Sequence, residues 1–557
     1  MKKIILLIVS LIQFTILFGQ QTGMNTYVLR FTDKGVSPDF VINASLYLSQ
    51  KAIERRIKYQ IPVDQTDLPL REQYVNDVSS TGARILARSR WFNTIVIEAD
   101  TNMIINISAL SCISKVELLI YNSQAKHVAS ETSSPFFKAE TVNPWQIKMN
   151  EGGPTDKYNY GTAYNQINQL KGQYLHNLGF SGEGMLIAVI DAGFSSADIM
   201  PCFDSLRANK QIKGTRDFAQ LGNNIYATSM ATHGTSVLSC MGANVSGKMV
   251  GTAPKADYWL LRSEVYATES ITEEYFWVSA AEFADSVGAD LINSSLGYTT
   301  FDNASTNHSY SDLNGNTTMA TIGADKAASK GILVVNSAGN SGGAGWWYIG
   351  APADGDSVFT IGAVNSIGVR ASFSSVGPTS DGRIKPTVMG QGSGAALYSP
   401  GGLTSGSGTS FSSPIICGIT ACLWQALPEL NNMQIIDIIK STSSQASNPD
   451  SLMGWGIPNY ETAYTTLSIR DHIVTKSLIV YPNPVYDKIT LAFPAPIQGK
   501  YKIEIVNIEG TVVYSNHRSE SSVHSIQIND IGSLPPGIYL LKVSGVSLVY
   551  TGKIIKM

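Results

Sequence analysis

The stretch from residue 185 to residue 193 reads MLIAVIDAG, six apolar residues that lead directly into Asp191-Ala192-Gly193. An apolar run of this length, without polar alternation, predicts a strand that is buried on both faces of a sheet. Four similar runs follow it, with helical patterns between them, at residues 258–262, 291–295, 332–337 and 358–364. Because strands that alternate with helices form parallel sheets, we predict an α/β fold with a doubly wound parallel sheet.

Asp191 ends the first of these runs, and the active sites of open parallel sheets lie beyond the carboxyl ends of their strands. A carboxylate at this rim can orient a catalytic base, although an ordinary turn aspartate fits the segment equally well. His233 is followed by Gly234 and by small and apolar residues, which predict a buried helix that would fix the imidazole in place. A lone histidine is more often structural, so neither residue decides the chemistry by itself.

Ser410 lies in the segment GSGTSFSSP, residues 406–414, and an apolar helical pattern begins directly after it. Placed there, the hydroxyl lies at a helix N-terminus, where backbone N–H groups and the helix dipole stabilise an anionic intermediate. Asn340 follows the strand predicted over residues 332–337, and its amide could donate to the same oxyanion. A capping serine in a glycine-rich loop and an asparagine in a tight turn are the structural alternatives.

Four segments together resemble the signatures of the subtilase family of serine peptidases, in the order in which that family carries them. They are Asp191-Ala192-Gly193, His233-Gly234-Thr235, Gly339-Asn340 and Gly408-Thr409-Ser410-x-x-x-Pro414. The likeness implies a subtilisin-like peptidase domain over residues 145–469. By this resemblance Asp191 orients His233, and His233 takes the proton of Ser410. Asn340 and the Ser410 backbone N–H stabilise the oxyanion of an acyl-transfer reaction.

The resemblance also implies a substrate-binding segment made of Ser295, Leu296 and Gly297, which would pair with an extended substrate backbone. Gly350 matches the family position that floors the primary specificity pocket. Ser341 stands where several relatives carry an acid, and an uncharged residue beside an open pocket favours large apolar substrate side chains.

Three further positions depart from the family pattern, since Ser236 replaces a histidine while Phe411 and Ser412 replace the common Met-Ala. None of these changes removes an atom of the implied catalytic triad. They affect the expected substrate preference more than the expected activity.

The segments before and after the catalytic region predict two smaller domains. Residues 21–144 begin as a compact α+β unit, end in a polar linker, and resemble the propeptides that inhibit such enzymes until they are cleaved. Residues 475–557 contain short alternating runs punctuated by proline, which predict a small antiparallel β-sandwich. Tyr481-Pro482-Asn483-Pro484 and Leu534-Pro535-Pro536-Gly537 resemble the C-terminal sorting domain of type IX secretion in Bacteroidetes. A carbohydrate-binding or other accessory sandwich is the alternative on architecture alone.

Residues 1–20 have the build of a signal peptide, because Lys2 and Lys3 precede an apolar run that ends at Phe18. This run is shorter than the ~20 residues that span a bilayer. We therefore expect a protein that is secreted, or attached to the outer surface of a Gram-negative bacterium.

A net charge of -3, without a basic run, gives no reason to expect nucleic acid as a partner. The expected partners are protein or peptide substrates, the protein's own propeptide and the type IX secretion machinery.

The implied chemistry requires no cofactor. Asp312-x-Asn314-x-Asn316 begins like a calcium loop, but Gly323 stands where a bidentate glutamate should close it. A structural calcium ion is compatible with the family, while its ligands cannot be named. Five cysteines are too few for a disulfide framework in an exported protein of this length, so buried thiols are expected.

Two other functions fit parts of the sequence. The segment GNSGG, residues 339–343, fits the Gly-x-Ser-x-Gly motif of lipases and esterases, but every histidine after Ser341 lies in the tail, where it could not complete that triad. A catalytically silent subtilase scaffold that serves as a surface binding protein is the second alternative, and the presence of all four chemical groups argues against it. We therefore predict a secreted serine endopeptidase that is made as a precursor.

Overall fold

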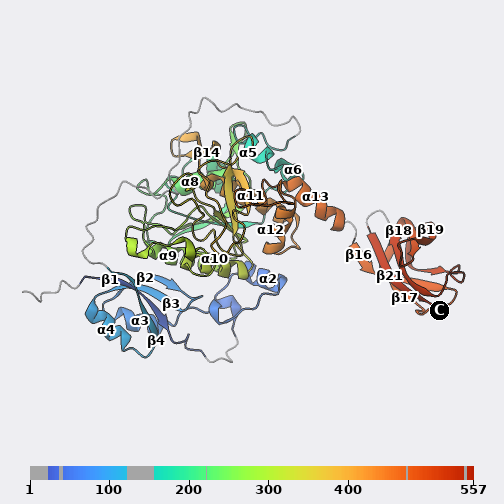
Figure 1. Cartoon of the computed structure of the whole chain (residues 1–557), viewed down its shortest axis with the longest axis horizontal. Helices are drawn as coiled ribbons and strands as arrows, with labels where there is room; N and C mark the ends of the chain where they lie inside the picture. Colours follow the sequence, from blue (N-terminus) through green and yellow to red (C-terminus); the bar gives the residue numbers. More distant parts are fainter. Residues whose placement is uncertain (1–22, 37–41, 122–155, 221, 472–473, 545–547) are drawn as a thin grey trace, which may run out of the picture. The chain divides into compact units, whose positions relative to one another are not determined.

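The computed structural model describes residues 23–36, 42–121, 156–220, 222–471, 474–544 and 548–557 (Figure 1). They form two compact units, one that ends at Glu461 and one that begins at Thr462. The predicted signal peptide and residues 122–155 of the predicted linker lie outside the described residues. Among the helices of the described part, none is long and apolar enough to cross a membrane.

The first unit begins with a four-stranded antiparallel sheet in the order β2-β3-β1-β4. Its strands are β1 (Asn25–Phe31), β2 (Arg84–Ser89), β3 (Thr94–Ala99) and β4 (Ile113–Ile120), and its helices are α2 (Gln50–Lys58), α3 (Glu72–Ser79) and α4 (Thr101–Ser108). Leu29 and Ile95 of the sheet share an apolar core with Val78 of α3 and Ile107 of α4. The predicted α+β unit ahead of the catalytic region is thereby confirmed.

The centre of the first unit is a seven-stranded sheet in the order β13-β12-β11-β10-β5-β9-β6, and all its neighbouring strands are parallel. The strands are β5 (Leu186–Asp191), β6 (Ile212–Asp217), β9 (Asp257–Arg262), β10 (Leu291–Ser294), β11 (Leu333–Ser337), β12 (Phe359–Val364) and β13 (Val388–Gln391). The strand of this sheet that comes first along the chain, β5, lies between β9 and β10, so the strand order changes direction beside it. Such a switch point is where open α/β sheets carry their sites.

Helices cover both faces of this sheet (Figure 1). Leu186, Ala188 and Ile190 of β5 pack into one core with α9 (Thr272–Val287) and α10 (Met319–Ser329). Because side chains alternate along a strand, the intervening residues of β5 face the opposite side. On that side α8 (His233–Gly242) packs against α11 (Thr409–Ala426), and α11 contacts β10 to β13. The predicted doubly wound parallel sheet is therefore confirmed.

The remaining elements of the first unit are short or peripheral. They are α5 (Tyr164–Asn168), α6 (Gln173–Asn177), α7 (Asp204–Ala208), α12 (Asn432–Ser441) and the ribbons β7 (Asn244–Val245) with β8 (Met249–Val250) and β14 (Ala395–Ser399) with β15 (Gly402–Gly406). Helix α13 (Tyr460–Asp471) begins at the end of this unit. All five cysteines are buried free thiols, as the sequence predicts.

The second unit is a mainly antiparallel sheet in the order β16-β21-β20-β18-β17, with β19 paired to β18. Its strands are β16 (Val474–Ser477), β17 (Ile479–Tyr481), β18 (Ile489–Val506), β19 (Val512–Ile528), β20 (Gly537–Ser544) and β21 (Leu548–Lys556). Ile503, Ile505, Leu541 and Val543 alternate into a separate apolar core. The runs at residues 488–493 and 501–507 predict two short strands, whereas the structure joins them in β18, whose pairing with β19 has register shifts after Ala492.

Candidate active site

Asp191 and His233 meet where β5 ends and α8 begins. The Asp191 side chain is fully buried, and its Oδ1 accepts hydrogen bonds at 2.8 Å from His233 Nδ1 and from the Ala192 N–H. Since a carboxylate only accepts, Nδ1 carries the proton and Nε2 is the nitrogen that can act as a base. Gly234 permits this approach, because a Cβ there would lie 2.5 Å from the Gly193 carbonyl oxygen.

Ser410 is the second residue of α11, as its sequence setting predicts. It is 1 % exposed, and its carbonyl oxygen accepts a hydrogen bond from Ser295 Oγ at 2.9 Å. The ring of the next residue, Phe411, lies 6.1 Å from the imidazole of His233 between centroids. The structure therefore brings the start of α11 beside the start of α8 and against the end of β10.

Asn340 is held by Thr409, the residue before Ser410. Its Oδ1 accepts hydrogen bonds from the Thr409 N–H at 2.8 Å and from Thr409 Oγ1 at 3.0 Å. These two bonds fix the orientation of the amide. Its Nδ2 lies 3.6 Å from the position that a Cβ on Gly408 would take. The donor nitrogen is therefore directed toward the loop that leads into the Ser410 helix.

The predicted substrate-binding segment, Ser295 to Gly297, continues directly from β10. Its middle carbonyl, of Leu296, accepts a hydrogen bond from Asn336 Nδ2 at 3.1 Å, and the Leu296 side chain is buried. The next residue, Tyr298, exchanges two backbone hydrogen bonds with Ala351, at 2.8 and 3.1 Å. Ala351 directly follows Gly350, so the structure places the predicted pocket floor beside the predicted substrate segment.

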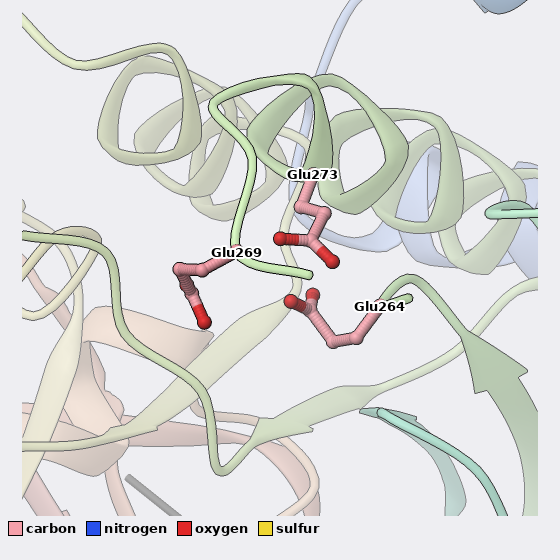
Figure 2. Close-up of side chains that lie close together, drawn as sticks. All are labelled: Glu264, Glu269 and Glu273. Atoms are coloured by element: carbon pink, nitrogen blue, oxygen red, sulfur yellow. The ribbon is translucent and has the colours of Figure 1, made fainter. Parts of the chain in front are cut away.

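Three glutamates that no sequence motif singles out lie close together (Figure 2), and one of them, Glu264, accepts a hydrogen bond from Tyr298, the residue after this segment. Carboxyl oxygens of Glu264, Glu269 and Glu273 lie within 4.8 Å of one another. Burial raises the pKa of the Glu264 carboxyl to about 7. Burial and the neighbouring Glu264 raise the pKa of Glu273 well above its usual value. The only local signals in the sequence are a glutamate just after an apolar strand and an acidic pair at a helix start, and both are common in ordinary structure.

Carboxylate oxygens are the ligands that calcium prefers, yet these groups already accept hydrogen bonds from the protein. Glu273 accepts from the Val265 and Ser270 N–H groups at 2.7 and 2.8 Å. We assign no ion to the cluster. The segment that begins like a calcium loop closes on itself as well, since Asp312 accepts from the Ser309 N–H and hydroxyl. A calcium ion elsewhere in the protein stays a prediction.

Comparison with protein-family models gives three matches that together cover most of the chain. Residues 182–456 match the subtilase family, residues 26–134 match the peptidase S8 propeptide domain of Bacteroidota, and residues 479–557 match the secretion system C-terminal sorting domain. The last match indicates export across the outer membrane, as the sequence predicts.

Three curated relatives align with slightly more than half of the chain. Subtilisin NAT of Bacillus subtilis subsp. natto is 32% identical over 301 residues, which are 53% of this chain and 70% of the relative. Subtilisin of Bacillus pumilus is 32% identical over 305 residues, 53% of this chain and 97% of the relative. Alkaline elastase YaB of Bacillus sp. (strain YaB) is 28% identical over 299 residues, 53% of this chain and 69% of the relative.

Proposed function

The chain belongs to the subtilase family, and from this premise we propose that it is a secreted serine endopeptidase whose catalytic triad is Asp191, His233 and Ser410. The observation that carries the proposal is the 2.8 Å hydrogen bond from His233 Nδ1 to the buried Asp191 carboxylate. That bond leaves Nε2 to take a proton, beside the helix start that carries Ser410. The order of the three residues along the chain is that of the family.

In the proposed reaction His233 Nε2 takes the hydroxyl proton while Ser410 Oγ attacks the carbonyl carbon of the scissile bond. The tetrahedral intermediate collapses when His233 returns that proton to the leaving amine. Water then enters by the same route and releases the acyl group from Ser410. Throughout, Asp191 stabilises the imidazolium without becoming protonated.

Asn340 is the proposed side-chain donor to the oxyanion, with the Ser410 backbone N–H as the second donor. Two features support this role. Thr409 holds the amide oxygen of Asn340 with two hydrogen bonds, so the amide does not need to reorganise during the reaction. The helix dipole of α11 adds positive potential at the same place.

Ser295, Leu296 and Gly297 are the proposed site for the substrate backbone, and Gly350 is the proposed floor of the pocket for the side chain before the scissile bond. The uncharged Ser341 near this floor favours large apolar side chains. Neither the triad nor the oxyanion donors require a cofactor for this chemistry.

We further propose that residues 21–144 act as a propeptide that stays bound to the catalytic domain of residues 145–469 until it is degraded. Buried polar contacts between the two parts support this. Glu282 of α9 accepts hydrogen bonds from the Arg90 and Trp91 N–H groups at 2.9 and 3.0 Å. Asp285, one turn further along α9, forms buried ion pairs with Arg55 and Arg56 of α2.

Casein hydrolysis by pure processed protein tests the proposed function. We expect Ser410→Ala, processed in trans by wild type that is then removed, to lose at least about three orders of magnitude in rate, as loss of a triad nucleophile does. Ser412→Ala is the matched control, because Ser412 is a buried serine of the same helix whose hydroxyl donates to the Thr409 carbonyl oxygen. Undiminished hydrolysis by Ser410→Ala would disprove the triad. An inactive processed wild type would favour a binding protein on a subtilase scaffold.

A further inference from the structure

Glu264 is a buried carboxyl group without a cationic partner among the residues that the structure describes. It is 4 % exposed, and the ion pairs of the described residues include none to it. The neighbouring Arg262 is engaged elsewhere, because its Nη1 contacts Asp217 at 2.6 Å and its Nε donates to the Ala192 carbonyl oxygen. Since burying a carboxyl group without a cation is unfavourable, the hydrogen bonds that this group accepts must offset the cost of its burial.

Two hydroxyl groups converge on one oxygen of Glu264. Tyr298 Oη and Ser263 Oγ each donate to Oε1 at 2.7 Å. The Ser263 N–H also donates to the backbone oxygen of Asp191 at 3.1 Å. Through Ser263 and Tyr298, the Glu264 carboxyl group therefore links the end of β5, which carries Asp191 of the proposed triad, to the chain that continues from β10.

Tyr298 directly follows the proposed substrate segment, Ser295 to Gly297, and is held on two sides. Its backbone is paired with Ala351, and its side chain reaches Glu264 in the interior. Tyr298 is 1 % exposed, so its hydroxyl has no bulk water to replace this acceptor. The hydrogen bond to Glu264 is thus the side-chain anchor at the end of that segment.

A second carboxyl group limits how Glu264 can move. Glu273 of α9 points its carboxyl group toward that of Glu264 (Figure 2). Glu273 is itself fixed by the Val265 and Ser270 N–H groups, which belong to the loop between β9 and α9. The Glu264 side chain is therefore confined between this loop and Tyr298.

We propose that Glu264 is a positioning residue for the peptidase, which through Tyr298 holds residues 295–297 in the extended form that pairs with substrate backbone. This inference rests on the proposed function, because it explains what keeps the proposed substrate segment in its extended form. Hydrolysis of a peptide that pairs along this segment should depend on the hydrogen bond between Tyr298 and Glu264. Hydrolysis of a small activated ester, which does not reach the segment, should depend on it less.

The test compares kcat/KM for a peptide substrate of five or more residues with kcat/KM for a small activated ester such as p-nitrophenyl acetate. The ratio of the two values is independent of the amount of active enzyme. We expect Tyr298→Phe to lower the ratio about fivefold, the effect of one lost hydrogen bond, mainly through a higher KM for the peptide. Glu264→Ala should lower the ratio at least as far. Glu264→Gln should stay within about twofold of wild type, since its amide oxygen still accepts.

Tyr460→Phe is the matched control, because the Tyr460 hydroxyl is also buried and forms a 2.7 Å hydrogen bond with Thr420 Oγ1 in a different part of the same unit. It should leave the ratio unchanged. If Glu264→Ala fails to fold, Tyr298→Phe decides alone. An unchanged ratio in Tyr298→Phe, with an active wild type, would overturn the inference. A wild type inactive on both substrates would instead overturn the proposed function and the inference with it.

Discussion

Gly234 decides how closely the helix that carries His233 can approach the strand that carries Asp191. A Cβ at this position would lie 2.5 Å from the Gly193 carbonyl oxygen and 3.0 Å from the Asp191 Cβ. Backbone atoms cannot turn aside as a flexible side chain can, so α8 would have to move. The importance of this glycine could be predicted from the sequence, because Gly234 directly follows His233 in the motif.

We expect Gly234→Ala to lower kcat about a hundredfold, since shifting a catalytic base by about 1 Å has an effect of this size. The measurement is peptide hydrolysis per active site, with active sites counted by a fluorophosphonate probe. Gly401→Ala is the control, because the nearest atom to its added Cβ would be a serine hydroxyl at 3.7 Å. A Gly234→Ala enzyme with wild-type kcat would show that α8 can shift without consequence.

Glu264 illustrates what residue patterns do not reveal. The motif residues could be predicted because each motif is contiguous, whereas the partners of Glu264 include Tyr298, 34 residues away. Nothing in the sequence alone indicates that the side chains of Glu264 and Tyr298 meet. Glu264 and Glu273 are much closer in sequence, but their side chains meet only because the loop between β9 and α9 brings the helix start back beside Glu264.

Burial raises the pKa of Glu264 from its usual 4.5 to about 7. Hydrogen bonds from Ser263 and Tyr298 act against this shift, and the charge of Asp191 acts in the same direction as burial. The native state therefore retains a proton that the unfolded chain releases. The associated stability is fully present below pH 4.5 and is lost as the pH rises to about 7. Glu264→Gln removes this dependence. We expect its Tm, relative to wild type, to be higher at pH 8 than at pH 5, and an equal difference at both values would contradict the assignment.

At the scale of elements, the sequence predicts five of the seven strands of the central sheet. The missed strands are β6, an edge strand of sequence IKGTRD with exposed charged residues, and β13, which has four residues. Neither has the apolar run by which buried strands are found, because β6 carries charged residues and β13 has only two apolar residues before a glycine and a glutamine. In the second unit β18 was divided into two, since its register shifts interrupt the alternation.

The contact between α2 and α9 depends on buried charges. Arg56 lies between Asp67 and Asp285 at 2.9 and 2.8 Å, and all three side chains are at most 1 % exposed. Burial acts to raise the pKa of Asp67, but hydrogen bonds from Arg56 outweigh it and lower that pKa to about 2. The Asp67 carboxylate is therefore charged at neutral pH in the intact contact, and removing Arg56 takes away its nearest cation.

We expect Arg56→Ala, made in a Ser410→Ala precursor that cannot process itself, to lower the free energy of unfolding by about 3–5 kcal/mol. Arg84→Ala is the control, because the Arg84 side chain pairs with Glu98 at 67 % exposure and should contribute at most about 1 kcal/mol. Urea unfolding measures both. Equal losses in the two variants would mean that the buried pairs do not hold α2 to α9.

At the scale of the whole molecule, the order of parts along the chain could be predicted because each has its own composition and periodicity. The apolar runs of the parallel sheet differ from the alternating strands of the second unit, and each unit has a separate apolar core. The boundaries proposed at residues 144, 145, 469 and 475 stay predictions, since neighbouring elements such as α13 continue across one of them.

Because the proposed propeptide precedes the peptidase domain in the chain, maturation requires a cut between them. We expect wild type to be cut between residues 122 and 161, where the sequence is polar and aperiodic, and Ser410→Ala to keep its N-terminal part covalently attached. Intact-mass measurement of both proteins decides. A wild type that is fully active while uncut would contradict the role of the propeptide.

The most direct test of the triad is to treat processed wild type with a fluorophosphonate probe and to locate the adduct by peptide mass mapping. We expect one adduct, on Ser410, and none in Ser410→Ala or His233→Ala after each has been processed in trans. An adduct on another serine, or a processed and folded wild type that takes up no probe, would contradict the triad.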